Sequence, residues 1–243
     1  MSLHKRISVC LCSYNGEKYI TEQIRSILKQ LTADDELIIS DDGSTDSTPT
    51  IISEFEKNDE RVRVVPGPGK GIISNINSVL KLAGGRFIFL ADQDDQWEDG
   101  KVEKVLGEFL RSDASLVVHD AVLVDSDNKK VLAPSFFALK KCRPGFARNI
   151  IKNSYIGCCM AFRREFLKVI LPIPTDIKMH DQWIGLVLEK KHGQFLKPVF
   201  MKDKLVRYRR HEGNQTGLSH DPVLKMIRYR VRLLKRLAQR KLI

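Results

Sequence analysis

Hydrophobic residues in the first hundred positions form short continuous runs that alternate with amphipathic stretches. The continuous runs have the length of buried strands, whereas the stretches between them repeat apolar residues at helical spacing. Continuous apolar strands separated by amphipathic helices predict an α/β fold, in which helices flank both faces of a mostly parallel central sheet. The expected strands are residues 7–12, 36–39, 61–65 and 87–90, and the expected helices lie within residues 20–31, 49–55 and 73–83.

The second half of the chain has a less regular pattern. Residues 115–124 are apolar and strand-like but are interrupted by His119 and Asp120, and residues 125–130 have the composition of a turn. With 243 residues and no low-complexity linker, the chain predicts one large domain made of two closely fused halves. We further expect loops or short helices over residues 133–153, a strand over 158–162 and a helix over 181–190.

Three polar clusters directly follow expected strands of the first half. Parallel strands end at the same edge of a sheet, and ligands of such sheets bind beyond the carboxyl ends of the strands. The clusters are therefore expected to meet at one ligand-binding edge. They are Ser13-Tyr14-Asn15, Asp41-Asp42-Gly43-Ser44 and Asp92-Gln93-Asp94-Asp95.

The last of these clusters places Asp92, Asp94 and Asp95 within four residues. Like charges so close repel one another unless a cation relieves the repulsion. Carboxylate oxygens suit Mg²⁺ or Mn²⁺, and Mg²⁺ typically takes one or two carboxylates together with the phosphates of a substrate. The alternative is a solvated acidic turn, but its position directly after a buried strand favours a metal site.

The composition is that of a globular protein, with 42% hydrophobic and 29% charged residues. No apolar run approaches the roughly 18–20 residues that a bilayer span needs. The polar first six residues do not have the pattern of a secretory signal. The five cysteines are odd in number and show no zinc-site spacing, so we expect reduced thiols and a cytoplasmic protein.

The net charge of +11 is concentrated at the C-terminal end, because residues 222–243 carry eight Lys and Arg and no acid. This segment predicts a basic amphipathic helix, which either docks on an anionic membrane surface or packs on its own domain. Aromatic residues are sparse there, which disfavours nucleic-acid binding. The expected apolar face comprises Val223, Ile227, Val231, Leu234 and Ala238, opposite Lys225, Arg228, Arg232, Lys235 and Arg236.

Four motifs in this order resemble those of family-2 glycosyltransferases with the GT-A fold. Residues 7–15 are similar to the first strand and "SYN" turn of that family, and residues 41–46 to its "DDGSTD" motif. Residues 83–88 are similar to the stretch before the metal motif, and Asp92-Gln93-Asp94 to the Asp-x-Asp metal motif itself. The resemblance covers roughly residues 5–215 and implies an inverting, metal-dependent sugar transfer from a nucleotide diphospho-sugar.

The resemblance also implies functional halves. Residues 1–100 would form a Rossmann-like half that binds the nucleotide-sugar, residues 101–220 the acceptor-binding and catalytic half, and residues 221–243 the basic helix. Asp94 would bind the metal, and Asp92 the ribose or the metal. The implied nucleotide-binding residues are Ser13, Tyr14, Asn15, Glu17, Asp42, Asn75 and Asp92.

Two of these positions need comment. Asp42 is a good partner for the ring N–H of a pyrimidine such as uracil or thymine, because a carboxylate accepts that hydrogen bond. Asn75 matches a recurrent asparagine of the family. The chain departs from the family at Gly69-Lys70-Gly71, where the pattern is often Asn-x-Gly, and this departure puts that contact in doubt.

The chemistry of inverting transfer requires a base for the acceptor hydroxyl. A carboxylate with a raised pKa in a cleft can serve. Asp181, in Met179-His180-Asp181-Gln182-Trp183, matches the position of an Asp that precedes a helix in the family. The bland alternative is a helix cap, and Asp120 is the competing base.

Residues near position 210 add positive charge. The order Arg209-Arg210-His211, followed by Asn214-Gln215, resembles a motif of bacterial rhamnosyltransferase-like members of the family. By that resemblance, Arg209 and Arg210 would contact the diphosphate and His211 the metal, offsetting the charge of the leaving group. The alternative is a basic surface loop.

The sequence therefore predicts a glycosyltransferase that uses Mn²⁺ or Mg²⁺. Its donor would be a UDP- or dTDP-sugar, with rhamnose suggested by the subgroup, and its acceptor a saccharide or lipid-linked saccharide of bacterial cell-surface polysaccharide synthesis. Any membrane contact would be peripheral, on the inner face of the cell membrane. A sugar nucleotidyltransferase is disfavoured, because no Gly-rich basic loop follows the first strand. A catalytically silent nucleotide-binding module is disfavoured by the intact acidic clusters.

Overall fold

The computed structural model describes residues 6–190, 197–214 and 222–242. Its strands are β1 (Ile7–Ser13), β2 (Glu36–Asp41), β3 (Val62–Pro66), β4 (Phe87–Asp92), β5 (Gln96–Trp97), β6 (Leu116–Val124), β7 (Val131–Ala133), β8 (Met160–Arg163) and β9 (Val199–Arg209). Its α-helices are α1 (Ile20–Leu28), α2 (Thr48–Asn58), α3 (Ile72–Leu82), α4 (Lys101–Ser112), α5 (Phe136–Lys140), α6 (Phe146–Ile151), α7 (Leu167–Ile170), α8 (His180–Lys190) and α9 (Val223–Gln239). Two short 3-10 helices, η1 (Gly157–Cys159) and η2 (Arg164–Phe166), flank β8.

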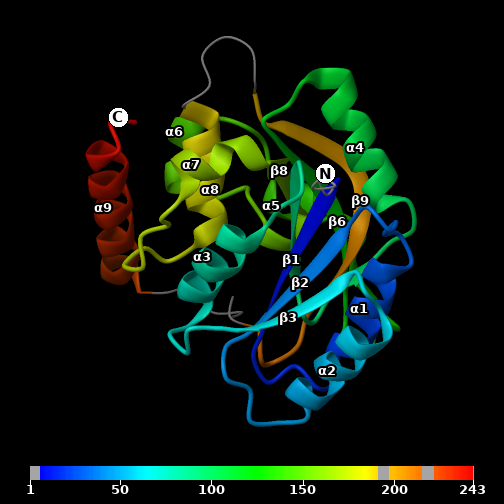
Figure 1. Cartoon of the computed structure of the whole chain (residues 1–243). Coiled ribbons are helices and arrows are strands. Elements are labelled where there is room, and N and C mark those ends of the chain that lie inside the picture. The colour runs from blue at the N-terminus through cyan, green and yellow to red at the C-terminus, as the bar shows by residue number, and fades with distance from the viewer. Residues whose placement is uncertain (1–5, 191–196, 215–221, 243) are drawn as a thin grey trace.

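The strands form one sheet in the order β3-β2-β1-β4-β8-β6-β9-β5, and β7 pairs with β6. Strand β1 runs parallel to β2 and β4, and β2 runs parallel to β3. Strand β8 is antiparallel to both β4 and β6, so β6 and its parallel partner β9 point the same way as β1. Helices cover this sheet (Figure 1), which confirms the expected α/β architecture.

This topology gathers strand ends that are far apart in sequence. Because β1, β2, β4 and β9 point the same way, their last residues lie at the same edge of the sheet: Ser13, Asp41, Asp92 and Arg209. The three polar clusters therefore meet at this edge, as the sequence predicts. The end of β9 joins them there.

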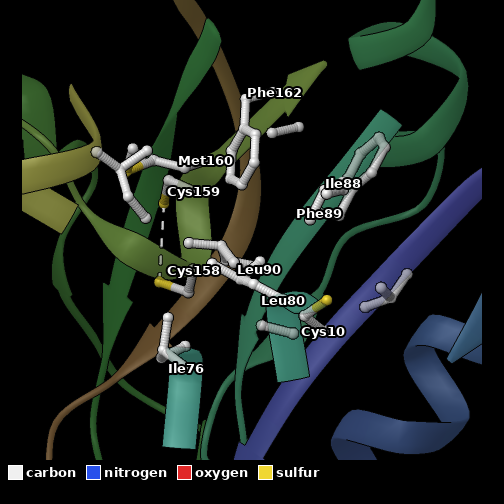
Figure 2. Packing of buried hydrophobic residues seen from close by; sticks show 14 of the residues in the cluster. Cys10, Ile76, Leu80, Ile88, Phe89, Leu90, Cys158, Cys159, Met160 and Phe162 are labelled. Carbon is white, nitrogen blue, oxygen red and sulfur yellow. Dashed lines mark hydrogen bonds between the residues drawn. The ribbon is translucent and has the colours of Figure 1, made fainter. Parts of the chain in front are cut away.

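The core lies on both faces of the central strands. Every residue of β1 is buried, which explains why its sequence is apolar without alternation. Figure 2 shows Cys10 of β1 beside Leu90 of β4 and Leu80 of α3, with Ile76 of α3 close to Cys158. All five cysteines are free thiols, as expected.

The second half contains elements that the sequence did not predict. The strand expected within residues 115–124 is confirmed, because β6 continues through His119 and Asp120, where its register with β9 shifts. Helix α4 and strand β9 were not among the expected elements.

Among the described helices, none combines the length and hydrophobicity needed to cross a bilayer.

Candidate functional site

The acidic cluster forms the turn between β4 and β5, and the end of β9 crosses it. Strand β5 pairs with β9, which brings Arg209 against the turn. The Arg209 amide donates to Asp95 Oδ1 (3.0 Å), and its Nε donates to the carbonyl of Asp94 (2.8 Å). Its Nη2 reaches Glu22 Oε2 on α1 at 2.5 Å, and its Nη1 reaches the carbonyl of Ser126 at 2.9 Å. Only 3% of Arg209 is exposed, so this guanidinium fastens the turn to α1 and to the loop after β6.

Asp94 faces the residues that follow β9. Its Oδ2 lies 2.8 Å from His211 Nε2 and accepts a hydrogen bond from Asn214 Nδ2 at 3.0 Å. The His211 ring lies against Tyr19, with ring centroids 4.8 Å apart. Two adjacent ligands of an octahedral Mg²⁺, each about 2.1 Å from the ion, lie about 3 Å apart. The spacing of Asp94 Oδ2 and His211 Nε2 therefore fits a shared cation.

Behind Asp94, the acidic cluster continues into the interior. One ligand atom each of Asp92, Asp95 and Cys158 lies within 4.8 Å of the others. Asp95 Oδ2 is buried and accepts no hydrogen bond from the described residues. Burial and the charges of Asp94 and Asp92 raise the pKa of Asp95 well above its usual range.

Cys158 is a poor ligand for a hard cation. Contact with Cys159 and burial raise the pKa of its thiol well above the usual value, so the thiol stays protonated. The structure thus offers two sets of donors that suit Mn²⁺ or Mg²⁺: the carboxylates of Asp92 and Asp95, and the pair formed by Asp94 and His211.

Lys101 supplies a buried positive charge beside this cluster. It is 1% exposed, and its Nζ donates to the Cys158 carbonyl at 2.9 Å and lies 4.0 Å from the Trp97 ring centroid. Burial lowers the pKa of Lys101 to about 8. Burial and the charges of Asp94 and Asp181 raise the pKa of Asp92 to about 7. The charge of Lys101 opposes this shift and lowers the pKa of Asp92.

The expected nucleotide-binding residues lie in three loops that hold one another. Asn15 accepts from the Thr45 amide (2.8 Å) through Oδ1, and Glu17 accepts from the Ser47 amide (2.8 Å) through Oε2. Ser13 is buried and donates from Oγ to Asp41 Oδ1 at 2.8 Å. The SYN turn and the DDGSTD loop are thereby fixed to each other.

Gln93 ties the SYN turn to the acidic cluster. Its side-chain amide bonds both backbone groups of Tyr14, the amide and the carbonyl, each at 2.9 Å. The Tyr14 residue is 55% exposed at this edge. The backbone of Tyr14 is thus fixed to the acidic cluster while its side chain stays exposed.

Asp42 fixes the third loop, because its two oxygens accept the Gly69 and Gly71 amides, each at 2.8 Å. A carboxylate can accept more than two hydrogen bonds, and Asp42 is only half-buried. Asp42 therefore keeps the capacity to bind a ligand.

Asn75 lies deeper than Asp42. It is 1% exposed, and its Nδ2 donates to the Ser40 carbonyl at 2.8 Å. A contact between Asn75 and a ligand would require this pair to open. A pocket of ≈ 480 Å³ borders the same loops, lined in part by Asp41, Gly43 and Gly67–Gly69.

Asp181 lies in the first turn of α8 and approaches the same site. Its charge contributes to the raised pKa of Asp92, so the two carboxyls lie close enough to interact. Burial raises the pKa of Asp181 to about 7, against opposing hydrogen bonds from Gln182, Asn153 and Gly157. The competing base Asp120 is engaged elsewhere, since its oxygens accept from Ser135 Oγ (2.5 Å) and the Phe137 amide (2.8 Å).

These strands, loops and acidic side chains match a known family. The model of the family described as "Glycosyl transferase family 2" matches residues 8–171. The chain belongs to this family. The match includes the SYN turn, the DDGSTD loop and the acidic cluster, and ends before Asp181 and His211.

Relatives and solved structures extend the likeness. The chain is 32% identical over 155 residues to the Escherichia coli "UDP-Glc:alpha-D-GlcNAc-diphosphoundecaprenol beta-1,3-glucosyltransferase WfgD", covering 63% of this chain and 57% of WfgD. It is 28% identical over 228 residues to the "dTDP-rhamnosyl transferase RfbG" of Shigella flexneri, covering 85% of this chain and 73% of RfbG. The chain thus spans little more than half the length of WfgD.

Two solved structures share the fold. S. aureus TarS 1-349 in complex with UDP-GlcNAc superposes with a TM-score of 0.73 at 20% identity, covering 94% of this chain and 66% of TarS 1-349. The mannosyltransferase PcManGT from Pyrobaculum calidifontis, in complex with GDP-Man and Mn²⁺, gives a TM-score of 0.63 at 18% identity, covering 87% of this chain and 58% of that one. The expected GT-A fold is confirmed.

Four residues of this family-2 site escaped the sequence reasoning. Asn214 is part of the motif already noted around His211, and Gln93 stands inside the acidic cluster, so both could have been proposed from position alone. Asn153 lies in an irregular segment without a pattern. Lys101 looks like an ordinary charged helix residue, and only the fold shows that it is buried.

Proposed function

We propose that this chain is an inverting, metal-dependent glycosyltransferase. One observation carries the proposal: Asp94 meets His211 and Asn214 at the sheet edge where Asp181, with a pKa raised to about 7, interacts with Asp92. An anchor for a cation and diphosphate and a base for a hydroxyl thus lie in one site. In this proposal residues 1–100 bind the donor, and residues 101–220 bind the acceptor and complete the catalytic site.

The donor is held through three loops. The Asp42 carboxylate accepts the ring N–H of uracil or thymine, while the Ser13–Glu17 turn, with Tyr14 at its surface, borders the nucleoside. Asp92, Asp94 and His211 would hold Mn²⁺ or Mg²⁺, which would supply positive charge to neutralise the diphosphate. Of the two arginines we assign the diphosphate contact to Arg210, because it is half-buried whereas only 3% of Arg209 is exposed.

Transfer is a single displacement at the anomeric carbon. The acceptor oxygen forms its bond to that carbon as Asp181 takes the hydroxyl proton, and the bond to the diphosphate oxygen breaks with its electron pair. The charge lost at Asp181 reappears on the departing diphosphate, beside Arg210 and the metal ligands. A base whose pKa lies near 7 is well matched to this task.

The relatives suggest substrates. Their names include a UDP-glucose and a dTDP-rhamnose donor, which supports a UDP- or dTDP-sugar here, with rhamnose as a candidate. The diphosphoundecaprenol acceptor in the name of WfgD supports a lipid-linked saccharide acceptor in bacterial cell-surface polysaccharide synthesis. Such an acceptor would place this chain on the inner face of the cell membrane as a peripheral protein.

A donor panel tests the proposal. UDP- and dTDP-sugars, rhamnose included, are incubated with the full chain and Mn²⁺, and release of the nucleoside diphosphate by slow hydrolysis or transfer is measured. We expect at least one donor to be cleaved by the wild type and none by Asp94→Asn, while Asp127→Asn, in an exposed turn, stays active. Absence of both cleavage and thermal stabilisation by every donor would leave a catalytically silent module.

A further inference from the structure

Helix α9 (Val223–Gln239) docks on the domain through one of its faces. Leu233 and Leu237 are buried on that side. Arg236 pairs there with Asp176, Nε to Oδ1 at 2.9 Å, and Arg230 donates from Nη2 to the last backbone carbonyl of α6 at 2.8 Å. Arg236, which the helical spacing places opposite the expected apolar face, therefore pairs with an acidic residue of the domain. Figure 1 shows α9 as the outermost helix on the side of α6, α7 and α8.

A second face of α9 carries large apolar side chains that the domain leaves uncovered. The exposed fractions are 75% for Leu224, 47% for Ile227, 59% for Val231 and 36% for Leu234. At 100° per residue these positions span about 80° of the helix circumference, so we call them the apolar stripe. The side chain of Val223, also expected on this face, lies outside the described residues. The helix therefore packs on its own domain, as one of the two alternatives expects, and still exposes an apolar face.

Positive charge borders the apolar stripe. Lys225, Arg228, Arg232 and Lys235 are all exposed and, by the same spacing, lie on the flank of the stripe away from the domain. Residues 222–243 contain no acid to offset them. At the neighbouring end of α6, Ile151 is 67% exposed and is followed by exposed Lys152. The surface thus combines exposed apolar side chains with a cationic border.

We propose that the apolar stripe inserts into the headgroup region of an anionic lipid bilayer, with the basic border against its phosphates. Such a helix lies in the plane of an interface and binds through apolar burial together with attraction to acidic lipids. A second copy of this chain is the poorer occupant, because pairing two such faces would oppose their cationic borders. The inference rests on the proposed function, since a lipid-linked acceptor would reach α6 and α8 from that surface.

Liposome sedimentation of the full chain tests this assignment. Vesicles of phosphatidylcholine with one quarter phosphatidylglycerol should pellet the wild type, and pure phosphatidylcholine or 0.5 M salt should reduce the partition coefficient at least tenfold. The double variant Ile227→Gln/Val231→Gln should reduce the partition coefficient at least tenfold. Leu110→Gln, which replaces an exposed apolar side chain of α4, is the control and should leave the partition coefficient unchanged. Arg228→Glu/Arg232→Glu should lose binding to anionic vesicles. Lys57→Glu/Arg63→Glu changes the net charge by the same amount, but on α2 and β3, which lie away from α9 (Figure 1). This control should bind anionic vesicles more tightly than Arg228→Glu/Arg232→Glu.

Two further measurements separate this proposal from the proposed function. Donor cleavage in solution should be unchanged in the α9 variants, so loss of vesicle binding alone leaves the enzyme assignment intact. Light scattering should show the same mass for the wild type and Ile227→Gln/Val231→Gln. Equal vesicle binding by these two proteins, or a wild-type dimer that the variant abolishes, would overturn the lipid assignment.

Discussion

Asp181 differs from the other carboxylates of the sheet edge in its surroundings, and the role that we propose for it differs accordingly. Asp42 is bonded by two amides and Asp94 by an amide and an imidazole, whereas burial dominates at Asp181 and raises its pKa to about 7. The first two are therefore suited to binding. Asp181 is suited to exchanging a proton.

The rate of transfer should follow the ionisation of Asp181. The carboxylate is the active form, so kcat/KM at saturating Mn²⁺ should rise about tenfold per pH unit below about 7 and level off above it. Asp181→Asn should lower the rate by about 10²–10⁴-fold and remove this inflection. A flat profile between pH 5 and 8, or an active Asp181→Asn, would contradict the assignment.

Stability provides the control for that variant. Unfolded Asp titrates near 3.9, so a folded pKa of about 7 means that ionisation of Asp181 opposes folding once the pH exceeds the unfolded value. Asp181→Asn removes this penalty at pH 7.5. Its Tm should therefore equal or exceed that of the wild type, which excludes unfolding as the cause of lost activity.

At the scale of elements, the end of β9 is what completes the site. Arg209 and Arg210 are neighbours with different environments, because Arg209 bonds Asp94, Ser126 and Glu22 while Arg210 is only half-buried. Arg209→Met should lower the free energy of unfolding by about 3 kcal/mol, since it leaves buried acceptors unpaired. Arg210→Met should cost less than about 1 kcal/mol but should reduce transfer. Urea unfolding and donor kinetics measure the two effects; equal stability losses would contradict the difference.

The Gly84-Gly85 pair joins α3 to β4, and its second glycine packs directly against the backbone of β1. A Cβ on Gly85 would lie 2.3 Å from backbone atoms of Ile7 and Ser8 in β1, whereas one on Gly84 would lie 3.4 Å from the end of the Glu36 side chain. Gly85→Ala should therefore destabilise the fold by about 3 kcal/mol, because backbone must move. Gly84→Ala, the matched control, should cost less than about 1 kcal/mol. If the denaturant midpoints of the two variants shifted equally, the backbone of β1 would leave enough space for a Cβ atom at position 85.

The sequence predicts the first half of the molecule better than the second for a physical reason. Strands such as β1 and β4 are buried on both faces, so their apolar runs are continuous and easily recognised. Strand β9 contains Lys202, Asp203 and Lys204 at exposed positions, and this charged interruption hides it. The site residues on β9 were therefore accessible only through a family resemblance.

Pair contacts are the part of the site that sequence cannot supply. The acidic cluster and Asp42 follow strands, so topology alone predicts that they meet. The burial of Asn75 and Arg209 depends on how α3 and β9 pack, and the sequence marks neither as an interior residue. For these two residues the expected ligand contacts stay predictions, and the structure adds the contacts that each makes within the protein.

For the whole molecule, the donor and metal should act as one ligand that joins the two halves. Asp42 and Asp94 belong to the first half, His211 to the second, and the diphosphate would lie between them. A ligand at 100 times its Kd stabilises the fold by about 2.7 kcal/mol, which for a chain of this size is a Tm increase of roughly 5–10 °C. UDP together with Mn²⁺ should therefore raise the Tm by more than the sum of the shifts that UDP alone and Mn²⁺ alone produce.

Asp94→Asn should lose this additional increase in Tm, while Asp127→Asn should keep it. Additive shifts in the wild type would contradict a shared site, and a larger shift from UTP than from UDP would indicate nucleotidyl transfer instead.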